Sequence, residues 1–195
     1  MPELAHHWTR AEVLALPDDG KRYELVDGDL LVSPSPRPAH QRAVFALAGR
    51  LMPYVVAHRL GECFYLPADL DLDADHLVQP DLFVIPSRSG GPVREWTEAG
   101  IPLLTVEVIS PSTARYDRII KRRRYQRSGV PTYWIIDLDA RLAEVWTPDA
   151  ERPQVVEDIL TWQPGTEAPP LRIDLPAVFN EADGPSNAQV YPTGH

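Results

Sequence analysis

Two apolar segments joined by a basic segment constrain the fold of this chain most strongly. Residues 103–110 (LLTVEVIS) and 132–137 (TYWIID) are near-continuous apolar runs, which are typical of strands that are buried on both faces of a sheet. The basic segment between them ends at Gly129, a helix-stop signal, and we expect it to cross from one strand to the other as a helix. The stretch 103–137 therefore predicts a strand–helix–strand unit.

One acid, Glu107, lies inside the first apolar run. Burying an ionised carboxylate is costly unless a cation, a metal or a proton compensates its charge. A structural ion pair with an arginine is one explanation, and a place in a functional site is the other. The partners of Glu107 therefore decide what this segment does.

The distribution of charge is uneven. A net charge of −9 argues at first against a nucleic-acid partner, because Lys and Arg carry phosphate binding. Seven of the 19 basic residues nevertheless fall within residues 115–127, beside a single acid. They are Arg115, Arg118, Lys121, Arg122, Arg123, Arg124 and Arg127. Such a run is usually a solvated helix face, but its position directly after Glu107 makes the six arginines candidates for contacts with nucleic-acid phosphates.

Composition limits the class of protein. The single cysteine, Cys63, excludes an intramolecular disulfide, and no Cys/His cluster predicts structural zinc. We find no signal peptide and no run of transmembrane length, so we expect a cytoplasmic protein without a membrane partner. The length of 195 residues suits one domain, expected over residues 1–180. Residues 181–195 are polar and are expected to form a flexible C-terminal tail.

Further elements are expected on both sides of the central unit. Asp27-Gly28 predicts a β-hairpin between residues 21–26 and 29–33. Apolar residues at helical spacing predict a helix over 39–59, in which Pro53 should kink the helix or end its regular part. Other strands are expected over 62–66, 69–73, 78–85, 142–146, 155–160 and 171–175, with a closing turn at 176–179. This order predicts an α/β (α+β) fold, with a mixed β-sheet flanked by helices and an additional antiparallel β region.

Asp81 and Glu107 lie on successive apolar strands, and paired strands run about 4.8 Å apart. Two carboxylates at that distance repel each other, so one keeps a proton or a cation lies between them. Oxygen ligands in small number suit Mg²⁺, or Mn²⁺ as an alternative. Such an ion can activate water, and a nearby lysine can stabilise the developing charge. These ingredients match metal-dependent hydrolysis of phosphodiesters.

The motifs around these acids resemble the PD-(D/E)XK nuclease superfamily, in which a Pro-Asp pair precedes an acid on the next strand. The wider pattern is similar to the Uma-type family of restriction-endonuclease-like proteins over about residues 8 to 180. The blocks that carry the resemblance are YELVDGDLLVSPSP, His40-Gln41, QPDLFVI, VEVISPST, Asp117, Lys121, Tyr125 and GVPTYWIID. The resemblance implies a restriction-endonuclease-like fold, a divalent-metal site and endonuclease activity.

Carried over by position, the resemblance implies that Asp81 and Glu107 are the metal carboxylates and that Glu24 is an additional catalytic acid. The superfamily places its lysine two residues after the glutamate, where this chain has Ile109. The resemblance implies instead that Lys121, on the following helix, is the catalytic lysine.

Three further residues are candidates for orienting the site. Asp117 lies one helical turn before Lys121 and could orient it. His40 and Gln41 begin the helix expected over 39–59, and they either face the site or are solvated.

The leading hypothesis is therefore a Mg²⁺-dependent endonuclease that cuts DNA. A homodimer is expected, because each active site severs one strand. One alternative is a catalytically inactive nucleic-acid-binding or interaction module that keeps the fold. A third hypothesis is hydrolysis of a smaller phosphate ester.

Overall fold

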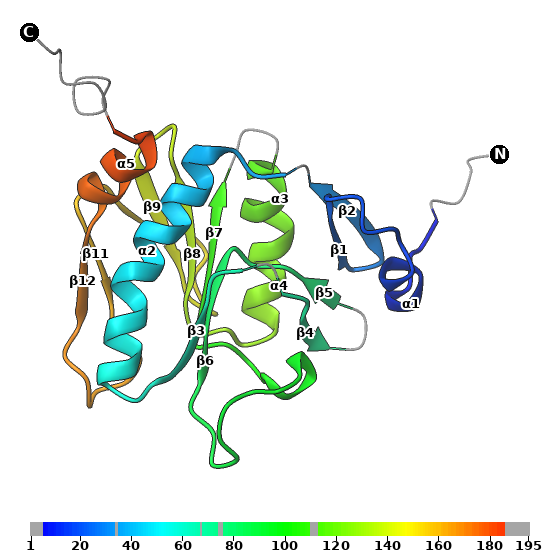
Figure 1. Ribbon diagram of the computed structural model, residues 1–195, viewed down its shortest axis with the longest axis horizontal. Coiled ribbons are helices and arrows are strands. Elements are labelled where there is room, and N and C mark those ends of the chain that lie inside the picture. Colours follow the sequence, from blue (N-terminus) through cyan, green and yellow to red (C-terminus); the bar gives the residue numbers. More distant parts are fainter. Residues whose placement is uncertain (1–5, 34, 67, 74–75, 110–112, 186–195) are drawn as a thin grey trace, which may run out of the picture.

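A six-stranded mixed sheet lies at the centre of the molecule (Figure 1). The computed structural model describes residues 6–33, 35–66, 68–73, 76–109 and 113–185. The strand order is β10-β9-β8-β7-β6-β3, in which β7 and β8 run parallel and the other neighbours antiparallel. The strands are β3 (Gly61–Phe64), β6 (Leu82–Pro86), β7 (Leu104–Ile109), β8 (Tyr133–Asp137), β9 (Leu142–Trp146) and β10 (Gln154–Val156).

A helical crossover joins the parallel strands β7 and β8, as the apolar runs predicted. It consists of α3 (Ala114–Tyr116), a π-helical turn η2 (Asp117–Lys121) and α4 (Arg122–Arg127). The parallel register pairs Glu107 with Ile135. The basic segment is thereby held against the strand that carries Glu107.

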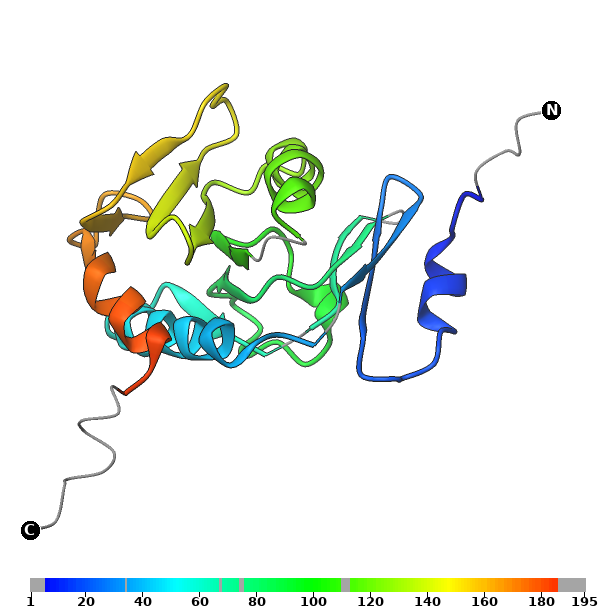
Figure 2. The same ribbon diagram turned by 90° about the horizontal axis from the view of Figure 1, so that it is seen from above.

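Helices cover both faces of the central sheet (Figure 2). On one face, α2 (Pro38–Ala57) and α5 (Leu175–Asp183) pack with Val106, Trp134 and other residues of the sheet. On the other face, Tyr125 of α4 packs with Tyr133 and Ile135. The strands are therefore buried on both faces, as predicted. Helix α2 continues beyond Pro53 to Ala57, so of the two expected effects of this proline, an end of the helix is not seen.

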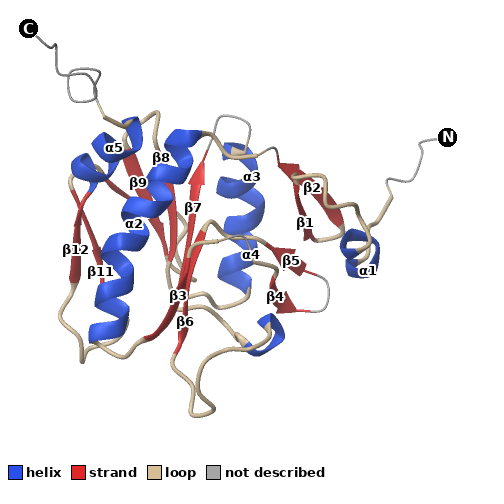
Figure 3. Cartoon of the chain, viewed as in Figure 1, coloured by secondary structure: helices blue, strands red, loops and turns tan. Residues whose placement is uncertain are grey.

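A smaller sheet stands beside the central one (Figure 3). Its order is β2-β1-β5-β4, with β1 (Arg22–Val26), β2 (Asp29–Ser33), β4 (Leu70–Asp73) and β5 (His76–Val78). The predicted hairpin is confirmed, and Asp27 and Gly28 both adopt positive φ, at 51° and 82°, as a type I′ turn requires. Leu25 packs with Val13 of α1 (Arg10–Leu14) and with Leu77.

The strand expected over residues 78–85 is divided between the two sheets. Val78 ends β5 of the small sheet, and β6 of the central sheet begins at Leu82. Pro80 and Asp81 therefore connect the sheets. The loop after β6 contains one 3₁₀ turn, η1 (Trp96–Glu98).

The C-terminal region differs most from expectation. Residues 155–160 are split between β10 and β11 (Ile159–Trp162), and β11 pairs only with β12 (Leu171–Asp174) among the described strands. The expected closing turn at 176–179 was wrong, because these residues belong to α5. Asp174 caps this helix by accepting a hydrogen bond from Ala177 N, with Pro176 in the first turn. Both are ordinary helix-start signals.

Helix α5 extends past the domain boundary that we expected at residue 180. It ends at Asp183, and its Ala182 is buried. The rest of the expected tail, residues 186–195, lies outside the described residues. Among the helices of the described ranges, none combines the length and the hydrophobicity needed to cross a membrane.

The cap of α5 makes a testable contribution to stability. Replacing Asp174 with alanine removes the acceptor of the Ala177 N–H, and loss of such a cap costs about 1 kcal/mol. We expect urea denaturation of Asp174→Ala to show a decrease of this size in the free energy of unfolding. Glu157→Ala, at an exposed acid outside the helices, is the control and should change stability little. Equal stability of the two variants would contradict the cap.

Candidate active site

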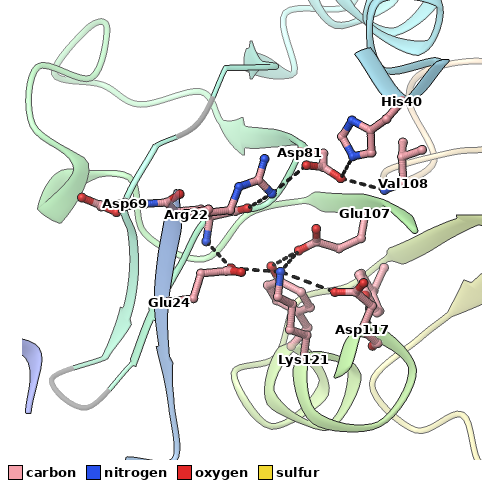
Figure 4. Close-up of polar contacts among 12 residues, drawn as sticks. Arg22, Glu24, His40, Asp69, Asp81, Glu107, Val108, Asp117 and Lys121 are labelled. Carbon is pink, nitrogen blue, oxygen red and sulfur yellow. Dashed lines mark hydrogen bonds and ion pairs between the residues drawn. The ribbon is translucent and has the colours of Figure 1, made fainter. Parts of the chain in front are cut away.

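Four acids and a lysine come together where the small sheet meets the central sheet (Figure 4). Glu24 comes from β1, Asp81 from the connection between the sheets, Glu107 from β7, and Asp117 and Lys121 from the π-helical turn. All five side chains are buried. The residues that the sequence predicted as catalytic thus converge from distant parts of the chain.

Lys121 lies at the centre of the cluster. Its Nζ is 2.9 Å from Glu24 Oε1, 3.0 Å from Glu107 Oε1 and 3.4 Å from Asp117 Oδ1. An ammonium has three donors, so each carboxylate can take one. Burial alone would lower the pKa of Lys121, but the three carboxylates raise it well above its usual value. Lys121 is therefore a permanent cation in the described site, and its expected contact with Asp117 is present.

Glu107 has a second donor, the hydroxyl of Tyr125, which lies 3.1 Å from Glu107 Oε1. The burial of Glu107 raises its pKa well above the usual value; Lys121 opposes the shift, and Asp81 and the other acids add to it. The sequence placed Tyr125 among the matching blocks without giving it a role. Its spacing of four residues from Lys121 is the signal that both face the same way from one helix.

Asp81 is held at both oxygens. Arg22 NH1 donates to Oδ1 at 2.8 Å, while His40 Nε2 and the Val108 N–H lie 2.9 Å and 2.8 Å from Oδ2. Burial opposes ionisation, but His40, Arg22 and the Val108 N–H together lower the pKa of Asp81 below its usual value. Because an ionised carboxylate only accepts hydrogen bonds, Nε2 of His40 carries the hydrogen.

His40 and Gln41, both expected as candidates for orienting the site, lie at different places relative to it. His40 contacts the site through Asp81. Gln41 is exposed and lines a separate shallow groove with Arg42 and Phe45, so the structure does not bring it to the acids. Helix α2 explains the difference, because consecutive residues of a helix point in different directions.

Glu24 joins the small sheet to the site. Its Oε1 accepts hydrogen bonds from Lys121 and from Gln79 N, the latter at 2.7 Å. Its Oε2 is buried and has no hydrogen-bond partner within the described residues. A buried carboxylate oxygen without a partner is costly, so this oxygen marks a position where a further donor or cation would be stabilised.

A cavity of about 360 Å³ opens onto these groups. Asp81, Glu107, Asp117 and Lys121 all contribute to its wall. Other lining residues are Arg22, Arg37, His40, Thr113 and Asp183. A ligand in this cavity would therefore reach both the acids and the cations.

The basic helix is less available to a ligand than its composition suggests. Arg118 pairs with Asp137 at 2.8 Å and with Glu144 at 2.6 Å. Arg122 stacks on Trp146 at 4.5 Å, and Arg124 is half-buried. The exposed arginines of the segment are Arg115, Arg123 and Arg127. Part of the basic patch therefore joins the helix to β8 and β9.

The charges of the cluster bear on metal binding. The acids Glu24, Asp81, Glu107 and Asp117 face two permanent cations, Arg22 and Lys121. If all four acids are ionised, the excess is two negative charges, the charge of one divalent ion. Asp81 accepts three contacts. A carboxylate offers about four lone-pair sites, so about one of them is left for a metal ion.

Two carboxylates of the site fit a hard divalent ion. Asp81 and Glu107 lie on the same cavity wall, and Mg²⁺ is often bound by one or two carboxylates, with water and substrate completing its shell. Among the described residues, no three His, Cys, Asp or Glu side chains are grouped as a ready metal centre. The donor set therefore suits an ion that keeps several waters better than one enclosed by protein ligands.

This mixed sheet with its helical crossover defines the restriction-endonuclease-like class of fold. Residues 10–177 match the Uma2 family, described as "Putative restriction endonuclease", and the chain belongs to this family. A solved structure of a putative nuclease of DUF820, from Anabaena variabilis ATCC 29413, has the same fold. Its TM-score is 0.72 at 20% sequence identity, over 90% of this chain and 99% of that one. No curated protein matches the chain.

Lys121 should be essential for stability as well as for the site. Replacing it with methionine leaves three acids buried without their shared cation, and breaking a buried ion pair costs about 3–5 kcal/mol. We expect Lys121→Met to lose this amount in urea denaturation at neutral pH with EDTA present. The control is Lys21→Met, at an exposed lysine that pairs with Asp19. A loss no larger than that of the control would show that the cluster does not depend on Lys121.

Asp81 should make stability depend on pH. Its folded-state pKa is lowered, so its contribution is present above the unfolded-state pKa of about 4 and is lost as pH falls through the folded-state value. We expect Asp81→Asn to be destabilised most near neutral pH, by roughly 3 kcal/mol. The difference from wild type should shrink below pH 4 in EDTA. A difference that stays constant over the pH series would contradict this assignment.

Proposed function

We propose that this protein is a metal-dependent endonuclease that hydrolyses DNA phosphodiester bonds, with Mg²⁺ as the cofactor and Mn²⁺ as a substitute. The observation that carries the proposal is the buried ammonium of Lys121, which Glu24 and Glu107 share at 2.9 Å and 3.0 Å. This arrangement supplies a cation beside paired acids although Ile109 occupies the usual lysine position. Membership of the Uma2 family supports the same conclusion.

Each group has a distinct proposed role. Asp81 and Glu107 would hold the ion, which when bound would lower the pKa of a water and offset negative charge on the phosphate. Lys121, whose ammonium contacts three carboxylates, would stabilise the oxygen that becomes negative in the transition state through its positive charge. Because its pKa is raised, it acts as a cation and not as a general base. Glu24 and Asp117 hold the ammonium in place.

DNA is the proposed substrate. Arg115, Arg123 and Arg127 are exposed on the crossover helices, and Arg37 lines the cavity. Arg118 and Arg122 make contacts within the protein, so we propose a supporting role for them and assign phosphate contacts to the exposed arginines. Cutting both strands of a duplex would use two copies of the single site, and we propose a homodimer for this reason. Location in the cytoplasm stays a prediction.

The second candidate is a catalytically inactive nucleic-acid-binding module. The specific observation in its favour is that Asp81 already has Arg22 and His40 as partners. A carboxylate neutralised by the protein has less need of a metal ion. This candidate predicts salt-sensitive DNA binding without metal-dependent cleavage.

Cleavage of plasmid DNA separates the two candidates. We expect nicking and linearisation by the purified protein with Mg²⁺ or Mn²⁺, and none with EDTA. Glu107→Gln should reduce the rate by at least about 100-fold, the usual effect of losing one charge-stabilising group. Glu98→Gln is the matched control, because Glu98 pairs with Arg88 outside the cavity. Undiminished cleavage by Glu107→Gln would contradict the proposed site, and DNA binding without cleavage by wild type would favour the second candidate.

A further inference from the structure

Arg22 is the cation in direct contact with Asp81. It lies on β1 two residues before Glu24, on the same face of the strand, and its NH1 donates to Asp81 Oδ1 at 2.8 Å and to Gln79 O at 3.1 Å. Its side chain is 17% exposed and lines the cavity beside Asp81 (Figure 4). The guanidinium therefore reaches the proposed metal ligand and the space for substrate together.

Arg22 and a metal ion would both bind the carboxylate of Asp81. A guanidinium stays protonated in proteins, so Arg22 keeps its positive charge under all conditions of interest. A divalent ion that binds Asp81 would bring two further positive charges close to it, in a buried place where screening is weak. Arg22 and the ion consequently compete for Asp81.

The two oxygens of Asp81 have separate partners. Oδ1 receives Arg22, whereas Oδ2 receives His40 and the Val108 N–H. Loss of the Arg22 contact would leave Oδ2 anchored to helix α2 and to the backbone of β7. Asp81 can therefore exchange its partner at Oδ1 without losing its position in the site.

We propose that Arg22 neutralises the charge of Asp81 in the metal-free protein. When a metal ion binds Asp81 and displaces Arg22, the guanidinium of Arg22 binds a phosphate of the DNA instead. The second part rests on the function proposed above. A divalent ion on Asp81 supplies the positive charge that Arg22 provides there in the metal-free protein, so the guanidinium no longer has Asp81 as its counter-charge. The phosphodiester that enters the cavity supplies a new one, and guanidinium groups match phosphate oxygens well.

The test measures metal binding and cleavage in the same variants. Arg22→Gln removes the competing charge, and Arg22→Lys keeps the charge but loses the planar donor group. Mn²⁺ binding is followed without nucleic acid, by calorimetry or by electron paramagnetic resonance. We expect Arg22→Gln to bind Mn²⁺ on the order of tenfold more tightly than wild type, within the range of typical coupling between two ligands. Its single-turnover cleavage at saturating Mn²⁺ should fall by roughly 100-fold.

Two controls and a substitute variant complete the test. Arg88→Gln, which breaks the pair with Glu98 outside the cavity, should leave both measurements unchanged. In an Asp81→Asn background, Arg22→Gln should no longer improve Mn²⁺ binding. If Arg22→Gln does not fold by circular dichroism, Arg22→Met, which also removes the charge, takes its place with the same expectations. Arg22→Lys keeps the competing charge, so its Mn²⁺ affinity should stay close to that of wild type while its cleavage slows.

A purely structural role of Arg22 predicts a different effect of its removal on Mn²⁺ affinity. If Arg22 merely holds Asp81 in position, its removal should weaken Mn²⁺ binding or leave it unchanged, and either result would overturn the proposal. Tighter binding with full cleavage activity would overturn the phosphate contact. Because metal binding is measured without DNA, a wild-type protein that binds Mn²⁺ but cuts nothing would overturn the nuclease function while leaving the competition at Asp81 testable.

Discussion

The ammonium of Lys121, shared by three buried carboxylates, is the interaction on which the site depends. Its partners come from β1, from β7 and from its own helical turn, with each N–O distance at or below 3.4 Å. Without this cation, Glu24, Glu107 and Asp117 would meet with no shared counter-charge between them. Contacts that join the small sheet to the central one are therefore also contacts of the site. We therefore expect a loss of Lys121 to lower the stability of the fold as well as to affect the site.

The connection between the sheets contributes the second half of the site. Leu82 pairs with Val106, so the preceding Asp81 reaches the end of β7 and accepts the Val108 N–H. Arg22 and His40 then hold Asp81 from two different elements. The cluster has four acids and two permanent cations, and it opens onto a cavity. A fold that only needed stability would often gain from apolar side chains at these positions, and the surplus of acids is consistent with the proposed cation and anionic substrate.

Much of the site could be predicted from the sequence, because several of its residues lie in sequence patterns that structural requirements alone seldom produce. Glu107 stood out as an acid in an apolar strand, with Asp81 as a second acid on the preceding apolar strand. The role of Arg22 was missed, since a single arginine on a hairpin carries no signal of its partner 59 residues away. Arg118 was assigned to nucleic acid because sequence could not show its pairs with Asp137 and Glu144. Helix α5 was missed although Asp174 and Pro176 are regular start signals, because the helix is short and follows a strand directly.

A crystal structure with Mn²⁺, measured at a wavelength that gives anomalous signal from manganese, tests the proposed metal site. We expect a single anomalous peak between the carboxylates of Asp81 and Glu107, with the ammonium of Lys121 still on Glu107. A crystal grown with millimolar Mn²⁺ that shows no peak there, or one that holds manganese only at surface acids, would contradict it.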